Sequence, residues 1–231
     1  MTVLTKQAPG LTGNQLKLIA LAAMTCDHIG VQLFPQLNIL RIIGRLALPI
    51  FAYMIAQGCH YTKNKQKYLM TIAATALLCQ LVYFFAMGSL YQCILVTFSL
   101  SIGLIFILDT AIKRPSAKNV AFVVLALLTV WSISELLPRL LPGFYVDYGF
   151  FGILLPVLIW LGKDKWQCIL LCGIGLILLS SGNTVQWFSL LALPFLALYN
   201  GSRGKTKLKY LFYIYYPAHL VLIWLVSLMY V

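Results

Sequence analysis

The sequence predicts an all-α fold, a single polytopic bundle of about nine transmembrane helices over residues 1–231. Hydrophobic residues make up 61% of the chain, charged residues only 10%, and the mean hydropathy is +0.92, whereas soluble domains carry about 25% charged residues. Apolar runs of about 17–25 residues recur, the length that a helix needs to cross the hydrocarbon core. The runs are continuous, whereas the strands of a membrane barrel alternate between polar and apolar residues.

Each element is an apolar run that ends at turn chemistry or at a basic cluster. The first run follows a polar segment and stops at Pro35, and the second stops before the basic residues that begin at Lys63. Later boundaries fall at Lys113-Arg114-Pro115, Pro142-Gly143, Ser181-Gly182-Asn183 and Asn200-Gly201. The predicted segments, in order, are 16–34, 39–59, 68–87, 93–112, 120–137, 148–161, 166–181, 185–199 and 209–230.

The basic residues predict the orientation of the bundle, because cytoplasmic loops are enriched in Lys and Arg. The N-terminal segment and alternate connections hold Lys6, Lys17, Lys63, Lys65, Lys67, Lys113, Arg114, Lys118, Lys163, Lys165, Arg203, Lys205, Lys207 and Lys209. The opposite side holds Arg41, Arg45 and Arg139. We therefore expect a cytoplasmic N-terminus and an external C-terminus. The formal charge of +12 reflects this topology and gives no indication of nucleic-acid binding.

The first predicted helix carries an acid beside a histidine, Asp27 and His28, inside its apolar run. Ionisable groups at this depth usually face the protein interior and have a partner. The first two helices form an antiparallel pair, and His28 and Arg45 lie equally far from the turn between them, about 13 Å at 1.5 Å per residue. Arg41 and Arg45, four residues apart, share one helix face. One or both arginines should reach Asp27 or His28.

Two interpretations of this group stay open. An ion pair between Asp27 and arginine would pin two helices together with little effect on stability. Alternatively, His28 is a general base, and the guanidinium groups of Arg41 and Arg45 stabilise a developing oxyanion. The residue pattern does not decide whether Asp27 orients His28 or pairs with an arginine.

Two further polar residues are candidates for the same region. His219 lies in the last predicted helix within about two turns of the depth of His28, so the two histidines are expected to share a cavity. The alternative for His219 is a packed histidine bonded to a carbonyl. Asp147 stands at the external mouth of the sixth segment, where a substrate amine, Arg139 or solvent would meet it.

The basic residues on the cytoplasmic side are candidates for phosphate binding, either to lipid headgroups or to a nucleotide-bearing cofactor, although topology alone also explains them. The candidates are Lys17, Lys63, Lys65 and Lys67. The six cysteines form no C-x-x-C pair and are interpreted as small apolar residues. The sequence has no zinc-ligand spacing, glycine-rich phosphate loop or serine triad motif.

Three stretches carry a resemblance to a known family. The segments "LTGNQLKLIALAAMTCDHIG", "LRIIGRLALPIFAYMIAQGCHYTKNKQKYL" and "FYIYYPAHL" resemble the TraX family of conjugal-transfer membrane proteins, whose named members acetylate the N-terminus of pilin. The resemblance implies a multi-pass acetyltransferase of the bacterial inner membrane that uses acetyl-CoA. It also implies that Asp27 and His28 carry catalysis. By the same resemblance, Arg41, Arg45, Tyr216 and His219 complete the site.

A fainter similarity is to transmembrane acyltransferases with a basic residue ten positions before a first-span histidine, which Lys17 and His28 would match with lysine in place of arginine. The leading hypothesis is acetyl transfer from acetyl-CoA, docked at the basic inner rim, to a protein N-terminus or to an envelope glycan or small molecule. In this hypothesis, Asp27 orients the base His28. The rivals are a proton-coupled transporter or flippase that uses Asp27, His28 and His219, and a non-catalytic assembly subunit.

Overall fold

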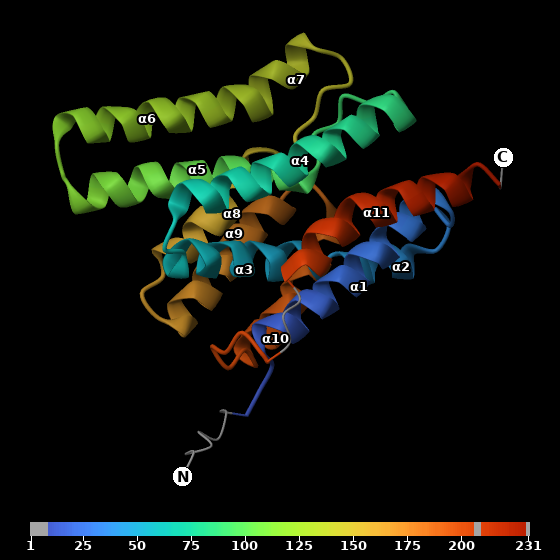
Figure 1. The fold of residues 1–231 in the computed structure, drawn as a ribbon, viewed down its shortest axis with the longest axis horizontal. Helices are drawn as coiled ribbons and strands as arrows, with labels where there is room; N and C mark the ends of the chain where they lie inside the picture. The colour runs from blue at the N-terminus through green and yellow to red at the C-terminus, as the bar shows by residue number, and fades with distance from the viewer. Residues whose placement is uncertain (1–8, 206–208, 230–231) are drawn as a thin grey trace.

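Figure 1 presents a computed structural model, which describes residues 9–205 and 209–229 as a helical bundle. Its elements are α1 (Gly13–Gln32), α2 (Asn38–Gly44), α3 (Ala47–Tyr61), α4 (Lys65–Met87), α5 (Ile94–Lys113), α6 (Ala117–Trp131), η1 (Ser132–Leu136), α7 (Leu137–Leu140), α8 (Gly149–Leu161), α9 (Lys165–Ser180), η2 (Thr184–Ala192), α10 (Leu193–Ala197) and α11 (Lys209–Ser227). The described residues form no β-strand, which confirms the all-helical class. Lys6, Lys207 and the last residue of the predicted segment 209–230 lie outside the described residues.

Polar side chains cap the starts of several helices, which places those starts before the apolar runs. Thr12 forms a capping box with Gln15 at the start of α1. The side chains of Asn64 and Ser116 accept backbone N–H groups at the starts of α4 and α6, and Asp164 does the same for α9. These helices therefore begin one to three residues before the predicted segments, because hydropathy does not register the polar first turn.

Three of the predicted segments are irregular. The second is broken at Arg45 and Leu46, between α2 and α3. The fifth contains a π-helical turn, Ser132–Leu136, in which the Leu137 N–H donates to the Ser132 carbonyl. Pro138 follows directly and has no N–H to donate, so the regular ladder is interrupted at this point. The eighth is mostly a 3₁₀-helix, η2.

Four helical stretches are long and apolar enough to cross a membrane: Asn38–Tyr61, Lys65–Phe85, Ile94–Lys113 and Ala117–Leu140. Shorter apolar helices occupy Gly149–Leu161, Lys165–Ser180, Thr184–Ala197 and Ile214–Ser227. The chain is therefore a helical membrane protein by length and composition. The count of nine spans and the side of the N-terminus stay predictions.

The helices differ sharply in how much they are covered by protein. In Asn38–Tyr61, 61% of the most apolar 18-residue stretch is buried inside the bundle, whereas in Ala117–Leu140 the buried share of the corresponding stretch is 11%. In Figure 1, α6 and α7 run along one edge beside α5, while α1 and α11 lie side by side on the other flank. Helices α8 and α9 pack against α3. The residues predicted for catalysis and substrate binding lie in α1, in α11 and in or directly after α2.

Candidate functional site

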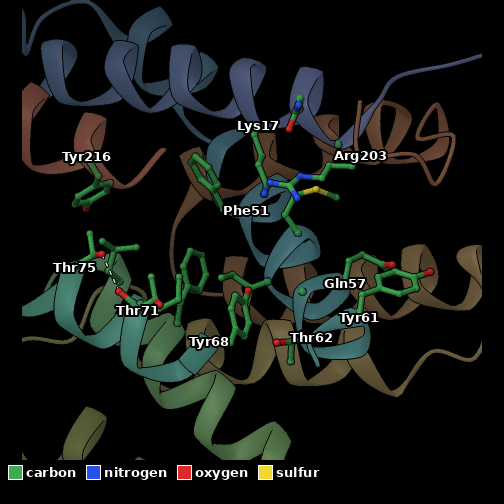
Figure 2. Close-up of a pocket in the computed structure, with 18 of the residues that line it drawn as sticks. Lys17, Phe51, Gln57, Tyr61, Thr62, Tyr68, Thr71, Thr75, Arg203 and Tyr216 are labelled. Atoms are coloured by element: carbon green, nitrogen blue, oxygen red, sulfur yellow. Dashed lines mark hydrogen bonds between the residues drawn. The ribbon is translucent and has the colours of Figure 1, made fainter. Parts of the chain in front are cut away.

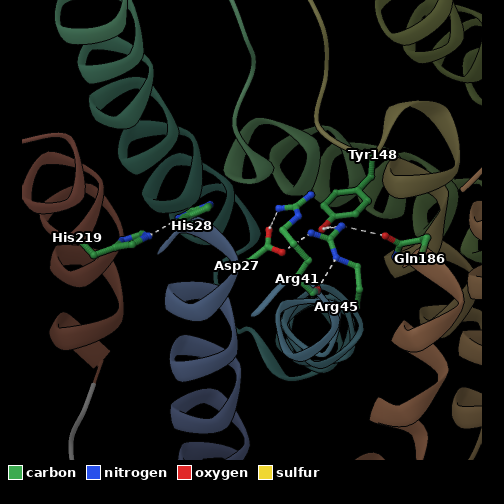
Figure 3. Close-up of polar contacts among 7 residues, drawn as sticks. All are labelled: Asp27, His28, Arg41, Arg45, Tyr148, Gln186 and His219. Atoms are coloured by element: carbon green, nitrogen blue, oxygen red, sulfur yellow. Dashed lines mark hydrogen bonds and ion pairs between the residues drawn. The ribbon is translucent and has the colours of Figure 1, made fainter. Parts of the chain in front are cut away.

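Asp27 and His28 point away from each other, toward different helices. Successive residues of an α-helix are about 100° apart around its axis. Figure 3 shows the carboxylate of Asp27 directed to the arginines of the α2 segment, and the imidazole of His28 directed to His219 of α11. The structure therefore favours arginine as the partner of Asp27. The contact by which Asp27 was expected to orient His28 is made by His219 instead.

The carboxylate of Asp27 bridges the two arginines. Its Oδ2 lies 2.9 Å from Arg41 NH1, and its Oδ1 accepts from Arg45 NH2. Gly44 makes room for this arrangement, because a Cβ at that position would overlap the Asp27 side chain. Gly30 has a similar role on α1, since its Cβ would lie 2.9 Å from that of Leu40. The two helices approach closely at small residues, and the ion pairs lie across that contact.

Arg45 is the centre of this polar network, and its side chain is only 7% exposed. Its NH1 donates to Gln186 Oε1 at 3.1 Å and to the Tyr148 hydroxyl at 3.3 Å. Tyr148 has a φ of 60°, the only positive φ of a non-glycine residue within the described ranges. Such a conformation is sparsely populated and is often found at functional sites. Gly152 permits it, because a Cβ there would overlap that of Tyr148.

The two histidines form a hydrogen-bonded pair across 191 positions of sequence. His28 Nδ1 lies 2.7 Å from His219 Nε2, and the rings are nearly parallel with centroids 4.9 Å apart. His219 Nδ1 lies 3.0 Å from the Tyr215 carbonyl oxygen, which can only accept. Neutral His219 therefore carries its proton on Nδ1 and accepts at Nε2 from the Nδ1–H of His28. The lone pair of His28 is left on Nε2, the atom that a general base needs.

Tyr215 and Tyr216 surround this pair. The Tyr215 ring stacks on His219 at 5.3 Å, and its hydroxyl hydrogen-bonds to Thr25 on α1 at 2.7 Å. The Tyr216 ring meets both imidazoles edge-on, with centroids 6.4 Å from His28 and 5.3 Å from His219. These contacts fasten α11 to α1 at the level of the histidines.

A cavity of about 640 Å³ lies between α1, α3, α4, α5 and Tyr216 of α11 (Figure 2). Lys17, Lys67 and Arg203 line it at one end, and Tyr216 lines it at the inner end. Apolar side chains cover the middle: Leu21, Phe51, Met54, Ile55, Ile72, Ile94, Leu95 and Phe98. Along α4 the lining extends from Asn64 to Thr75, about 16 Å at 1.5 Å per residue. A cationic mouth is thus connected to the tyrosine that contacts both histidines.

The segment after α10 places Arg203 at this mouth. The N–H groups of Gly13 and Asn14, which have no partner within α1, donate to the carbonyls of Ser202 and Arg203 at 2.8 and 3.0 Å. Figure 2 shows the Arg203 side chain directed toward Lys17. The mouth is therefore built from two parts of the chain that are distant in sequence.

The predicted phosphate-binding lysines fall into two groups. Lys17 and Lys67 line the cavity. Lys63 is not among its lining residues, and Lys65 forms an ion pair with Asp109 across α4 and α5. Sequence reasoning missed Arg203 as a member of the mouth, because positive-inside bias accounted for its charge.

Asp147 is held inside the fold and is not a solvated loop acid. Its N–H donates to the Gln92 carbonyl at 3.0 Å, and its carbonyl accepts from Thr97 at 2.8 Å. The carboxylate accepts a hydrogen bond from Tyr91, and burial raises the pKa of Asp147 to about 6. Its charge also acts on Arg45, although no ion pair joins the two among the described residues, so this loop acid lies beside the arginine network. Tyr148 and Gln186, the members of that network that the sequence did not indicate, are polar residues typical of loops and interfaces.

Comparison with known proteins places these residues in a family context. The sequence model described as TraX protein matches residues 12–227. The chain is 26% identical to the probable fimbrial assembly protein FimC, serogroup H1, of Dichelobacter nodosus, over 90% of this chain and 93% of that protein. It is 46% identical over 55 residues to an uncharacterized protein of Rickettsia prowazekii (strain Madrid E), which covers 24% of this chain and 22% of that protein. No solved structure matches.

Proposed function

The chain belongs to the TraX family, and from this premise we propose that it is a membrane acyltransferase that moves an acetyl group from acetyl-CoA to an amine or hydroxyl. The acceptor is a pilin-type protein N-terminus or an envelope glycan or small molecule. The similarity to a probable fimbrial assembly protein supports a role connected with surface appendages.

We propose nine membrane spans in the bacterial inner membrane, with the N-terminus in the cytoplasm. The described helical segments correspond one to one with the nine predicted runs once α2 joins α3, η1 and α7 join α6, and η2 joins α10. The distribution of Lys and Arg supports the orientation. CoA carries phosphates and is cytoplasmic, so the cationic mouth of the cavity would face its source.

The observation that carries the proposal is the cavity that extends from this mouth to Tyr216, whose ring contacts both histidines. Lys17, Lys67 and Arg203 supply positive charge for the CoA phosphates. The cavity extends about 16 Å along α4 and is apolar in its middle, which suits the extended arm of the donor. At its inner end, Tyr216 would place the thioester beside His28 and His219.

In the proposed reaction, His28 Nε2 takes the proton from the acceptor N–H or O–H while that atom attacks the thioester carbon. The carbon–sulfur bond then breaks, and the departing sulfur takes the proton from the imidazolium to give the CoA thiol. His219 holds the Nδ1–H of His28 and therefore fixes the tautomer. Asp27 acts as a positioning residue for Arg41 and Arg45, which contact the acceptor.

Labelled acetyl-CoA tests the proposal directly. Membranes that contain the wild-type chain should transfer label to an acceptor, and His28→Ala should abolish transfer while the protein is still inserted. His60→Ala is the matched control, because His60 stacks on Trp160 at 5.5 Å, outside the lining of the cavity. Equal transfer by wild type and His28→Ala would remove His28 from the mechanism.

A proton-coupled transporter or flippase is the second candidate, and the hydrogen bond between His28 and His219 favours it, because such pairs also relay protons. Thermal unfolding separates the two functions. Acetyl-CoA should raise the Tm of the purified enzyme through binding to the folded state. A transporter should respond to its solute or to pH, and not to acetyl-CoA.

A further inference from the structure

A second pocket, of about 330 Å³, lies at the other end of α1 from the cavity mouth. The mouth includes Gly13 and Asn14, whereas this pocket includes Gly30 and Val31, about 25 Å farther along the helix at 1.5 Å per residue. Its other lining residues include Asn38, Arg41, Arg45 and Asn183. This outer pocket is therefore polar and cationic, and the two pockets lie at opposite ends of one helix.

Arg41 presents unused hydrogen-bond donors to the outer pocket. A guanidinium group has five N–H donors in a planar fork. In the part of the chain that the structure describes, the polar contact of the Arg41 side chain is the ion pair of NH1 with Asp27 at 2.9 Å. The side chain is 34% exposed. Asp27 and Asp147 both act on the buried Arg45, so Arg41 is the arginine that remains open to a ligand.

Two buried polar atoms next to this pocket also have no partner among the described residues: Gln186 Nε2 and Ser189 Oγ. They lie three residues apart in the 3₁₀-helix η2, where such side chains line up along one edge. Gln186 follows Val185, a lining residue, and its Oε1 accepts from Arg45, another lining residue. Buried polar groups are nearly always hydrogen-bonded, so these atoms indicate a polar partner from outside the chain.

The arginines do not face the atom that we propose as the base. Figure 3 shows His28 of α1 directed toward α11. Arg41 and Arg45 lie on another side of α1, where the Asp27 carboxylate points toward them. They are therefore placed to hold a separate group, rather than the oxyanion that forms at the reacting carbonyl. A planar guanidinium fork is suited to phosphate or carboxylate oxygens.

We propose that the outer pocket binds an oxyanionic group, a phosphate or a carboxylate, through the open donors of Arg41. Assigning this group to the acceptor rests on the proposed acyl transfer. The acceptor would then carry a negative charge at a distance from the amine or hydroxyl that reacts. Gln186 is not itself a lining residue, but it is next to Val185 and bonded to Arg45, so its Nε2 is a second donor beside the pocket.

The test uses the full-length chain in phosphatidylcholine nanodiscs and phenylglyoxal, which modifies accessible arginines. Mass spectrometry follows the labelling rate of Arg41 and, as a control, of the exposed Arg139. Inorganic phosphate or acetate should slow labelling of Arg41 several-fold and leave Arg139 unchanged. Protection in phosphatidylglycerol nanodiscs without added anion would support the site and identify a lipid headgroup as the source. No selective protection of Arg41 in any arm overturns the proposal.

A pair of variants separates this site from the donor cavity. Inorganic phosphate should also raise the Tm of the wild-type chain, because it binds the folded state. Arg41→Lys keeps a cation beside Asp27 but removes the guanidinium fork, so it should lose most of this rise. In Lys67→Gln, which changes the other end of the molecule, phosphate should protect Arg41 as in wild type. Acetyl-CoA is measured with the same preparations. Failure of acetyl-CoA to stabilise the protein while Arg41 is protected would sink the acyltransferase and leave the anion site standing.

Discussion

The two faces of α1 at Asp27 and His28 differ in charge, burial and dependence on neighbours. On the histidine face, one hydrogen bond joins two imidazole rings that can both be neutral. Tyr216 contacts His28 and also lines the cavity. The arginine face holds full charges, with Arg45 almost entirely covered. Loss of one partner on the arginine face leaves an uncompensated buried charge and lowers the stability of the fold. Loss of an imidazole on the histidine face is expected to lower mainly the rate of the proposed reaction. Adjacent positions can thus serve stability and reactivity separately.

The largest expected effect comes from the charged face. Asp27→Ala leaves two guanidinium groups without their shared carboxylate, and we expect a loss of about 3–5 kcal/mol in unfolding free energy. Thermal unfolding in nanodiscs measures it, with His28→Ala as the comparison. If His28→Ala destabilised the protein as much as Asp27→Ala, the division between the two faces would be wrong.

The next effect is on catalysis. His219→Phe removes the acceptor that fixes the tautomer of His28, so acetyl transfer should fall by about a hundredfold with little change in Tm. His219→Gln, which restores an acceptor oxygen, should recover part of the rate. Equal rates for His219→Phe and wild type would show that His28 does not depend on this partner.

The pH dependence of stability tests the surroundings of Asp147, which lies beside the arginine face. Its folded-state pKa of about 6 lies above the unfolded value of about 3.9, so the protonated form favours folding. This contribution is present below pH 3.9 and is lost as pH rises through 6. Asp147→Asn cannot ionise, so its Tm relative to wild type should increase between pH 5 and pH 8. A difference that stays constant over that range would contradict the burial of the carboxylate.

The smallest effect is expected at the cavity mouth that serves the histidine face. Lys67→Gln should raise the KM for acetyl-CoA about threefold, in line with the modest energy of a solvent-accessible charge contact. Lys63→Gln is the control, since Lys63 is not among the lining residues. The two variants have the same change in net charge. Identical KM values would remove the mouth from donor binding.

The pairing of Asp27 with Arg41 and Arg45 was within reach of sequence reasoning, because both helices share one short turn and depth follows from counting residues. The choice between arginine and histidine as the partner of Asp27 was not. It depends on the rotation of α1 about its own axis, which packing against α2 and α11 sets through Gly30, Gly44 and Thr25.

Hydropathy and capping residues alone determined the helical class, the order of the helical segments and most of their boundaries, since these follow from local transfer and hydrogen-bonding energies. Counting residues already placed His219 near the depth of His28, but only the tertiary structure showed their direct hydrogen bond. It alone brought Tyr148 and Gln186 to Arg45, and Arg203 to Lys17. These residues are separated by about one hundred positions or more. Their contacts depend on how the whole bundle packs, and local sequence patterns do not determine that packing.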